Sequence, residues 1–480
     1  MPVPCPDTER TLPSALLRVS HPVTSRFAPS TTTSENSQMK VFWSLLLLLF
    51  VASLTSPHLK ALEKQPVSDY RARRVALAAK LQGGIAVLFA AEEPVLDFEP
   101  YRQDSNFYYL TGWNEPGAAL LITSQKSEYK ETLFLPTRDL RLEKYTGVKL
   151  DAASPDVTRA TGVDEVMDLT SLPGVLNKLI APDRRLARNI WTQPGVKSAN
   201  ALIIFTATTL GVDAAPTRDL TGPLNMLRVA KDAGEIDLLK KASAASIAGQ
   251  RTMMRSVKPG VTERTVAGKM TATWFEKGCE RPAYAPIVGS GINSTVLHYS
   301  ENTRTIEDGD VVVVDAACEY SMYASDITRT VPASGHFTAR QREIYNIVLG
   351  AQKAAIDAFV AGKSKINDRD RKDPDSLDTA AYKYINTHGK DLHGEPLGKY
   401  WLHGIGHTVG IEVHDAAEVY PQLLKPGVVF TIEPGVYIPE EKLGVRIECV
   451  FLVGADGKLI DLTADLPHTA EEVEAAMQEK

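Results

Sequence analysis

The amino-acid sequence predicts a mixed α/β (α+β) protein made of two domains, for three reasons. The chain has 480 residues, and a chain of this length usually folds into more than one domain, each with its own hydrophobic core. Apolar runs of strand length alternate with charged helical stretches over residues 64–222, as in a small α/β domain. Long helical patterns and then strand-rich sequence fill residues 223–473, where we expect the larger domain. The polar, turn-rich segment 217–223 separates the two.

The N-terminal domain is expected to begin with a helix and to continue with strands. Residues 70–81 are rich in Ala, Leu, Arg and Lys, which are good helix formers. Residues 84–90 form an unbroken apolar run that predicts a buried strand. The shorter runs 118–123 and 132–135 predict two more strands.

The C-terminal domain is expected to start with helices and to end in strands. The helical patterns cover residues 232–256, 262–277, 338–361 and 377–386. Pro259-Gly260 and Gly278 end the first two helices, and a capping box of Thr338 and Gln341 begins the third. The strand patterns cover residues 310–315, 428–433 and 444–453.

Composition and charge exclude several classes of protein. Hydrophobic residues make up 44% and charged residues 23%, which is ordinary for a soluble globular protein. These values exclude a disordered chain, a collagen-like fibre and a polytopic membrane protein. The 53 Lys and Arg residues against 59 Asp and Glu residues give a net charge of -6. Because a weakly acidic chain lacks the basic surface of a nucleic-acid-binding protein, we expect no nucleic acid partner.

Residues 1–56 look unlike the rest of the chain. Residues 1–38 are rich in Pro, Ser and Thr, and we interpret them as a disordered upstream extension of the reading frame. Residues 39–56 start with Met39-Lys40 and continue with an apolar core and a small-residue stretch, which is the pattern of a signal peptide. We therefore expect an exported protein, periplasmic or extracellular. A membrane anchor and a buried core helix are the alternatives, although the run is short for a membrane span.

The cysteines predict neither a disulfide framework nor a zinc site. The four cysteines are Cys5, Cys279, Cys318 and Cys449, and none forms a CxxC pair. If Cys5 is removed with the N-terminal segment, an odd number remains, and we interpret those three as buried thiols.

Two aspartates at strand ends are the first candidates for chemistry. Asp315 ends a Val-rich run, and Asp326 follows eleven positions later. Adjacent antiparallel strands could bring both carboxylates onto one face. Burying a charge is costly unless the charge is paired or bound to metal. An Asp that pairs with Arg or caps a turn is the alternative for either residue alone.

Histidines and two late glutamates add to this set. Three of the ten histidines, His403, His407 and His414, fall within 12 residues, in a Gly-rich segment. Glu433 and Glu448 interrupt apolar strand patterns, and an ion pair of Glu448 with Arg446 is the alternative for the latter. Four carboxylates and a histidine in such settings suit a pair of divalent metal ions. Mostly oxygen ligands favour hard ions such as Mn²⁺.

Several separated motifs resemble the pita-bread metallopeptidase family, which includes methionine aminopeptidase, prolidase and Xaa-Pro aminopeptidase (aminopeptidase P). The matching stretches are residues 288–299, 314–320, 326–330, 403–407, 413–415, 431–435 and 445–448. Residues 102–116 are also similar to the N-terminal domain of aminopeptidase P and prolidase, which methionine aminopeptidases lack. The resemblance covers about residues 64–473. It implies a C-terminal pita-bread domain preceded by a smaller α/β creatinase-type domain.

The resemblance also implies roles for individual residues. Five residues would hold two divalent metal ions, for which the oxygen-rich ligand set favours Mn²⁺: Asp315, Asp326, His407, Glu433 and Glu448. Glu433 would also transfer protons, and His298 and His414 would bind the peptide and stabilise the tetrahedral intermediate. The proline pocket would be shaped by His403 and Arg446 and lined by Tyr284 and Tyr437.

The implied activity is that of a metallo-aminopeptidase acting on proline-containing peptides. It would hydrolyse the N-terminal Xaa-Pro bond and release the first residue. The aminopeptidase branch also implies a homo-oligomer, either a dimer or a tetramer. Three alternatives stay open, namely a prolidase that cuts only Xaa-Pro dipeptides, a metal-free creatinase-like hydrolase, and a non-enzymatic peptide- or histone-binding module. The intact set of five ligands argues against the last two.

Overall fold

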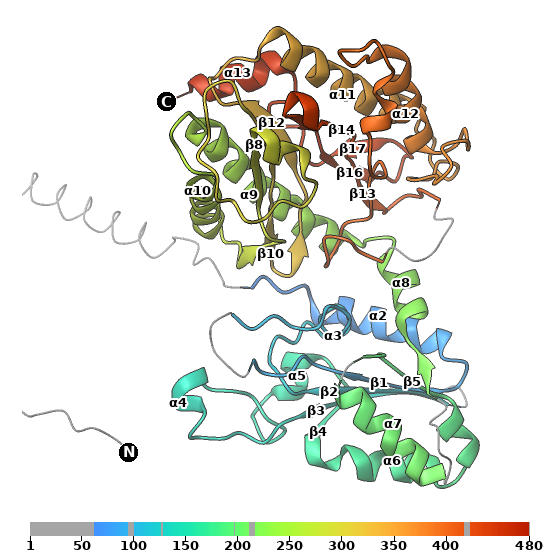
Figure 1. Cartoon of the computed structure of the whole chain (residues 1–480). Helices are drawn as coiled ribbons and strands as arrows, with labels where there is room; N and C mark the ends of the chain where they lie inside the picture. The colour runs from blue at the N-terminus through green and yellow to red at the C-terminus, as the bar shows by residue number, and fades with distance from the viewer. Residues whose placement is uncertain are drawn as a thin grey trace, which may run out of the picture. The chain divides into compact units, whose positions relative to one another are not determined.

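The computed structural model describes residues 62–94, 100–125, 128–195, 197–210, 217–416 and 423–479 (Figure 1). The expected upstream extension, residues 1–38, and the expected signal peptide, residues 39–56, lie outside these ranges. Within the described ranges, we find no helix with the length and apolar character needed to cross a membrane.

The N-terminal domain is built on one mixed six-stranded sheet with the strand order β4-β3-β2-β1-β5-β6. Its strands are β1 (Ile85–Phe89), β2 (Ala119–Gln125), β3 (Glu128–Leu135), β4 (Glu165–Asp168), β5 (Ile190–Thr192) and β6 (Arg218–Asp219). Its helices include α2 (Val67–Lys80), α3 (Ser105–Thr111), α4 (Glu143–Thr146), α5 (Val157–Thr161), α6 (Leu172–Ile180) and α7 (Lys197–Leu210). The expected helix and the three expected strands are all present.

Strand β1 is buried on both faces, which explains its unbroken apolar sequence. Ala86 and Leu88 belong to a core cluster shared with residues of α2 and α3. Ile85 and Val87 belong to a second cluster shared with residues of α6 and α7. Helices therefore cover both faces of this sheet.

The C-terminal domain contains the expected long helices. They are α9 (Ala233–Ser256), α10 (Glu263–Glu276), α11 (Ala339–Ala358) and α12 (Leu377–His388), and α8 (Thr221–Arg228) and α13 (Ala470–Gln478) flank them in sequence. The predicted capping box of Thr338 and Gln341 is confirmed at the start of α11. Asp232 and Glu235 form a second capping box that starts α9.

Short antiparallel sheets make up the rest of this domain. One sheet has the order β12-β9-β8, from β8 (Ile287–Ser290), β9 (Val311–Asp315) and β12 (Thr328–Pro332). A second has the order β13-β16-β17, from β13 (Val429–Ile432), β16 (Cys449–Val453) and β17 (Leu459–Asp461). The remaining strands are β7 (Arg281–Pro282), β10 (Cys318–Tyr320), β11 (Tyr323–Ala324), β14 (Gly435–Ile438) and β15 (Leu443–Arg446).

The prediction of a single strand over residues 444–453 is wrong. The structure divides it into β15, which pairs with β14, and β16, which pairs with β13. The break falls at Ile447-Glu448, where the amide of Glu448 donates to the carbonyl of Thr328 (3.1 Å) on another sheet. The sequence pattern cannot show this partner, because Thr328 lies far away along the chain.

The prediction of three buried thiols is wrong for two of them. Cys279 and Cys318 form a disulfide, whereas Cys449 is free and buried. The pairing of β7 with β10 places Cys318 opposite Pro282, three residues after Cys279. The spacing of the two cysteines in the sequence therefore could not predict the disulfide.

Candidate active site

The two candidate aspartates meet at the edge of the β12-β9-β8 sheet. Asp315 is the last residue of β9 and lies opposite Thr328, the first residue of β12. Asp326 precedes Thr328 by two residues. The hydroxyl of Tyr284 lies 2.6 Å from Asp315 Oδ1 and 2.6 Å from Asp326 Oδ1. A phenol has a single proton, so it donates to one carboxylate at a time. The expected juxtaposition of the two acids is present, and Tyr284 lies directly between them.

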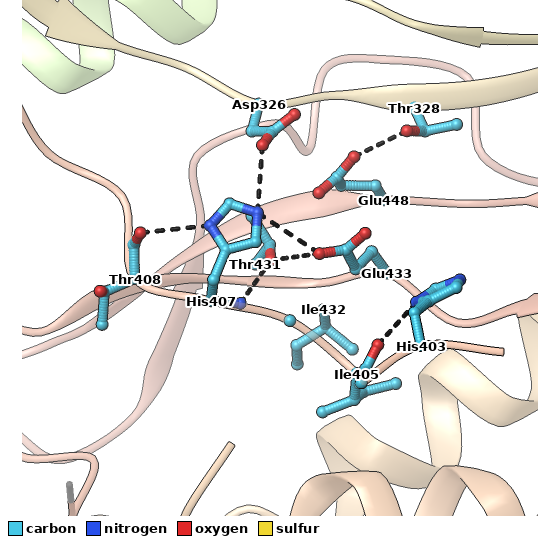
Figure 2. Close-up of polar contacts among 12 residues, drawn as sticks. Asp326, Thr328, His403, Ile405, His407, Thr408, Thr431, Ile432, Glu433 and Glu448 are labelled. Atoms are coloured by element: carbon cyan, nitrogen blue, oxygen red, sulfur yellow. Dashed lines mark hydrogen bonds and ion pairs between the residues drawn. The ribbon is translucent and has the colours of Figure 1, made fainter. Parts of the chain in front are cut away.

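The two candidate glutamates lie where neighbouring strands are interrupted. Glu433 follows β13, and Glu448 precedes β16. The amide of Glu433 donates to the carbonyl of Ile405 (2.8 Å), which ties this break to the histidine segment. Glu448 Oε2 accepts from the hydroxyl of Thr328 (2.6 Å), so one side of the carboxylate is fixed (Figure 2).

The ring of His407 points between these acids, as Figure 2 shows. Its Nε2 lies 3.3 Å from Asp326 Oδ2 and 3.4 Å from Glu433 Oε1. Its Nδ1 lies 3.2 Å from the carbonyl of Thr408, which can only accept, so Nδ1 carries a proton. This bond orients the ring with Nε2 toward the carboxylates, which is how a second hydrogen bond fixes a metal-binding histidine.

The glycines around His407 allow a close approach of two backbones. A Cβ on Gly406 would lie 2.1 Å from the carbonyl oxygen of Thr431, so no side chain fits there. Asn367 holds the same segment, because its Nδ2 donates to the carbonyl of Gly406 (2.7 Å) and its Oδ1 accepts from the amide of Ile405 (2.8 Å). Sequence reasoning missed Asn367, which sits in a polar loop with no motif of its own.

Three of the four residues expected to form the proline pocket make one hydrogen-bonded chain, whereas the fourth, Tyr284, contacts the two aspartates. Arg446 Nη2 donates to Asp315 Oδ2 (2.6 Å), and Arg446 Nη1 donates to the hydroxyl of Tyr437 (2.8 Å). That hydroxyl lies 2.8 Å from His403 Nε2. Burial and the charge of Arg446 lower the pKa of His403 to about 3, so its ring is neutral. Arg446 pairs with Asp315 rather than with Glu448, which was the expected alternative.

The last two candidate histidines, His298 and His414, are exposed. The ring of His414 stacks on that of His407 with centroids 3.8 Å apart. Burial and the charge of His407 lower the pKa of His414. The charge of His298 contributes to the lowered pKa of both His403 and His414, so His298 faces the same site.

The segment carrying His414 is anchored by its neighbour Asp415, a residue that sequence reasoning did not select. Asp415 is buried, its Oδ2 accepts from Lys231 Nζ (3.0 Å), and its Oδ1 accepts from Arg228. These cations lower the pKa of the carboxyl against the effect of burial. The available sequence signal was an acidic residue directly after a candidate histidine.

The anionic forms of three carboxylates of the site, Asp315, Glu433 and Glu448, are destabilised. Burial raises the pKa of Glu433 to about 7, and burial with the neighbouring acids raises the pKa of Glu448 well above its usual range. Burial also raises the pKa of Asp315, although Arg446 opposes this. His407 shows the opposite shift, because Asp326 and Glu433 overcome the effect of burial and raise its pKa to about 9. Such a cluster needs protons or cations to neutralise it.

The donor atoms of the cluster fit divalent cations. Asp326, His407 and Glu448 each offer one ligand atom, and these atoms all lie within 4.8 Å of one another. Glu448 Oε1 is buried and has no hydrogen-bond partner in the described part of the chain, so one carboxylate oxygen is left for a ligand. Asp315 and Glu433 extend the set toward a second ion. Carboxylate oxygens and one imidazole are ligands for hard or borderline cations.

Comparison with protein families identifies the class of this protein. Residues 237–455 match "Metallopeptidase family M24", and residues 70–190 match "Aminopeptidase P, N-terminal domain". The Xaa-Pro aminopeptidase of Haemophilus influenzae is 33% identical over 440 residues, which cover 86% of this chain and 98% of that protein. The chain belongs to metallopeptidase family M24, which implies that it uses divalent metal ions.

Further relatives place the chain within that family. Human Xaa-Pro aminopeptidase 3 is 33% identical over 400 residues, which cover 78% of this chain and 76% of that protein. The structure of Escherichia coli aminopeptidase P in its low-pH form is 29% identical, with a TM-score of 0.76 over 86% of this chain and 99% of that one. The fold is therefore that of the Xaa-Pro aminopeptidases, an N-terminal domain followed by a pita-bread domain, and the protein is a metallo-aminopeptidase. The metal-free and non-enzymatic alternatives are thereby disfavoured.

Proposed function

We propose that this protein hydrolyses the N-terminal Xaa-Pro bond of peptides and releases the first amino acid. One observation carries the proposal. The hydrogen-bonded chain from His403 through Tyr437 and Arg446 ends on Asp315, inside the cluster of four carboxylates and one histidine. The residues expected to recognise proline are thus physically joined to the candidate metal ligands. The relatives named Xaa-Pro aminopeptidase support the same substrate class.

The metal ions would be held by Asp315, Asp326, His407, Glu433 and Glu448. When bound, two divalent ions supply a nucleophilic water at neutral pH and polarise the peptide carbonyl. The oxygen-rich ligand set favours Mn²⁺ over ions that prefer thiolates.

The protein's own groups would bind the peptide and move its proton. As in the hydrolysis of any amide, the leaving nitrogen of an Xaa-Pro bond must gain a proton, which an acid–base group of the protein can deliver. The family resemblance implies that Glu433 carries out this transfer, and its Oε1 lies 3.4 Å from His407 Nε2. His298 and His414, both exposed, would donate hydrogen bonds to the oxyanion, as the resemblance implies.

Two broader properties are proposed with this activity. The protein is exported, which the apolar segment after Met39 supports, as does the disulfide of Cys279 with Cys318, because disulfides persist in oxidising compartments. It also assembles as a homo-oligomer, a dimer or a tetramer, as the aminopeptidase branch implies.

A panel of peptides tests the proposed substrate. The full chain loaded with Mn²⁺ is given an Xaa-Pro-Xaa tripeptide, the matching Xaa-Pro dipeptide, and a control tripeptide with alanine in place of proline. We expect release of the first residue from the proline tripeptide and little from the alanine control. Cleavage of the dipeptide alone would identify a prolidase instead. Equal cleavage of the proline and alanine tripeptides would contradict the proposed recognition of proline.

A further inference from the structure

Two buried glutamines on different helices make matching contacts next to the candidate metal ligands. Gln250 lies on α9 and Gln352 lies on α11, and both side chains are 0% exposed. Within the part of the chain that the structure describes, neither glutamine hydrogen-bonds to the side chain of a candidate metal ligand. Each one instead uses its amide group to bridge two backbone segments.

Gln250 bridges the two segments that carry the aspartates. Its Nε2 donates to the carbonyl of Ala316 (2.9 Å) and to the carbonyl of Ile327 (3.0 Å). Ala316 directly follows Asp315, and Ile327 directly follows Asp326. The two protons of one amide therefore span both aspartate segments.

Gln352 does the same for the segments that carry the glutamates. Its Nε2 donates to the carbonyl of Ile432 (2.8 Å) and to the carbonyl of Ile447 (3.2 Å). Ile432 directly precedes Glu433, and Ile447 directly precedes Glu448. Its Oε1 lies 2.6 Å from His468 Nε2, and an amide oxygen only accepts, so the histidine donates and fixes the orientation of the amide.

We propose that Gln250 and Gln352 are positioning residues, each of which holds one pair of metal-binding carboxylates at the spacing that two metal ions require. The inference rests on the proposed function of the site. A carbonyl one residue away from a ligand moves with the Cα of that ligand, so a donor shared between two carbonyls limits the separation of the two ligands. For the glutamate segments the strand ladder cannot do this alone, because they lie at breaks between strands. The aspartate segments are also joined directly, since the amide of Ala316 donates to the carbonyl of Ile327 (3.1 Å), and Gln250 adds a second link between them.

A purely structural role would give a different result. If the glutamines only dock α9 and α11 onto the sheets, their loss should lower stability without changing metal affinity. If they set the ligand spacing, their loss should weaken metal binding even in folded protein. Outer partners of metal ligands typically contribute 10- to 100-fold to metal affinity or activity.

The test uses Gln250→Met and Gln352→Met in the full chain, since methionine has nearly the same length and no amide protons. Each variant is loaded with Mn²⁺ and titrated with a competing chelator, and bound metal is measured. We expect at least one of the two Mn²⁺ ions to be lost at about 10-fold lower chelator concentration than in wild type. With saturating Mn²⁺, kcat should fall while KM for an Xaa-Pro-Xaa peptide stays within twofold.

Gln341→Met is the matched control. Gln341 lies on the same helix as Gln352, and its Nε2 also donates to a backbone carbonyl, that of Gly309 (2.8 Å), which adjoins no candidate ligand. We expect this variant to keep wild-type metal affinity. If a methionine variant does not fold, the shorter Gln250→Asn and Gln352→Asn variants carry the same expectation.

Two results would overturn the inference, and they distinguish failure of the inference alone from failure of the proposed function. If both glutamine variants retain Mn²⁺ as tightly as wild type and Gln341→Met, the glutamines are not positioning residues, although the proposed function stands. If wild-type protein itself retains no Mn²⁺ and cleaves no peptide, the proposed function fails and the inference fails with it.

Discussion

At the scale of single residues, the candidate site was largely predictable from its chemistry-bearing side chains. Acids such as Asp315 and Glu448 are conspicuous because they interrupt apolar patterns where charge is costly. The structure brings the acids and His407 together. The residues that orient them, such as Asn367 and Gln352, gave no sequence signal, because each acts through backbone groups that only tertiary structure brings near.

His468 predicts a pH-dependent stability at this scale. Its ring donates to Gln352, and burial together with the charge of Arg329 lowers its pKa from 6.5 to about 4. The unfolded ring binds a proton below pH 6.5, whereas the folded ring does so only near pH 4. The free energy of unfolding therefore falls as pH drops through this window.

The measurement compares unfolding by guanidinium at pH 7 and pH 5, in metal-free wild type and in His468→Gln. We expect wild type to lose about 1–2 kcal/mol more than the variant between these two pH values. The glutamine keeps a donor for Gln352 but cannot titrate. An identical pH dependence in both proteins would show that His468 is not held neutral by the fold.

At the scale of elements, helices were easier to predict than strands. The capping boxes and Gly or Pro stops define α9, α10 and α11 locally, so the sequence contains what is needed. Strands β15 and β16 were predicted as one, because alternation continues through Glu448 although the hydrogen-bond partner changes there. The disulfide was also missed, because the pairing of β7 with β10, which the sequence spacing does not show, brings Cys279 to Cys318.

The packing of α9 against α10 gives a prediction about stability. A Cβ on Gly249 would lie 2.0 Å from Trp274 Nε1, and the side chain of Trp274 is fully buried. Gly249→Ala should gain helix propensity but lose more through overpacking, for a net cost of about 1–2 kcal/mol. Chemical denaturation of the metal-free chain measures this difference.

Gly268→Ala on α10 is the control for that measurement. Nothing lies within 4 Å of a Cβ at Gly268, so alanine should stabilise the protein by up to about 1 kcal/mol. If Gly249→Ala were as stable as Gly268→Ala, the close contact of α9 with Trp274 would not limit the packing of these helices.

At the scale of the whole molecule, the two-domain α/β architecture and the family were both predictable from sequence. Seven motifs in the expected order matched the C-terminal domain, and residues 102–116 matched the N-terminal one. The comparisons confirm that architecture and the class of metallo-aminopeptidase. The identity of the metal, the export of the chain and its oligomeric state stay predictions, because the first depends on relative affinities and the others on residues or partners beyond the described fold.

The central claim is that four carboxylates and His407 form a centre for two metal ions that drives Xaa-Pro cleavage. The most direct test adds Mn²⁺ stepwise to metal-stripped protein and measures the initial rate of first-residue release from an Xaa-Pro-Xaa peptide. We predict that the rate rises until about two equivalents are bound, that chelator abolishes it, and that folded His407→Ala and Glu433→Ala stay inactive at every metal concentration. Full activity in the metal-stripped protein, or near-normal turnover by either variant, would contradict the account.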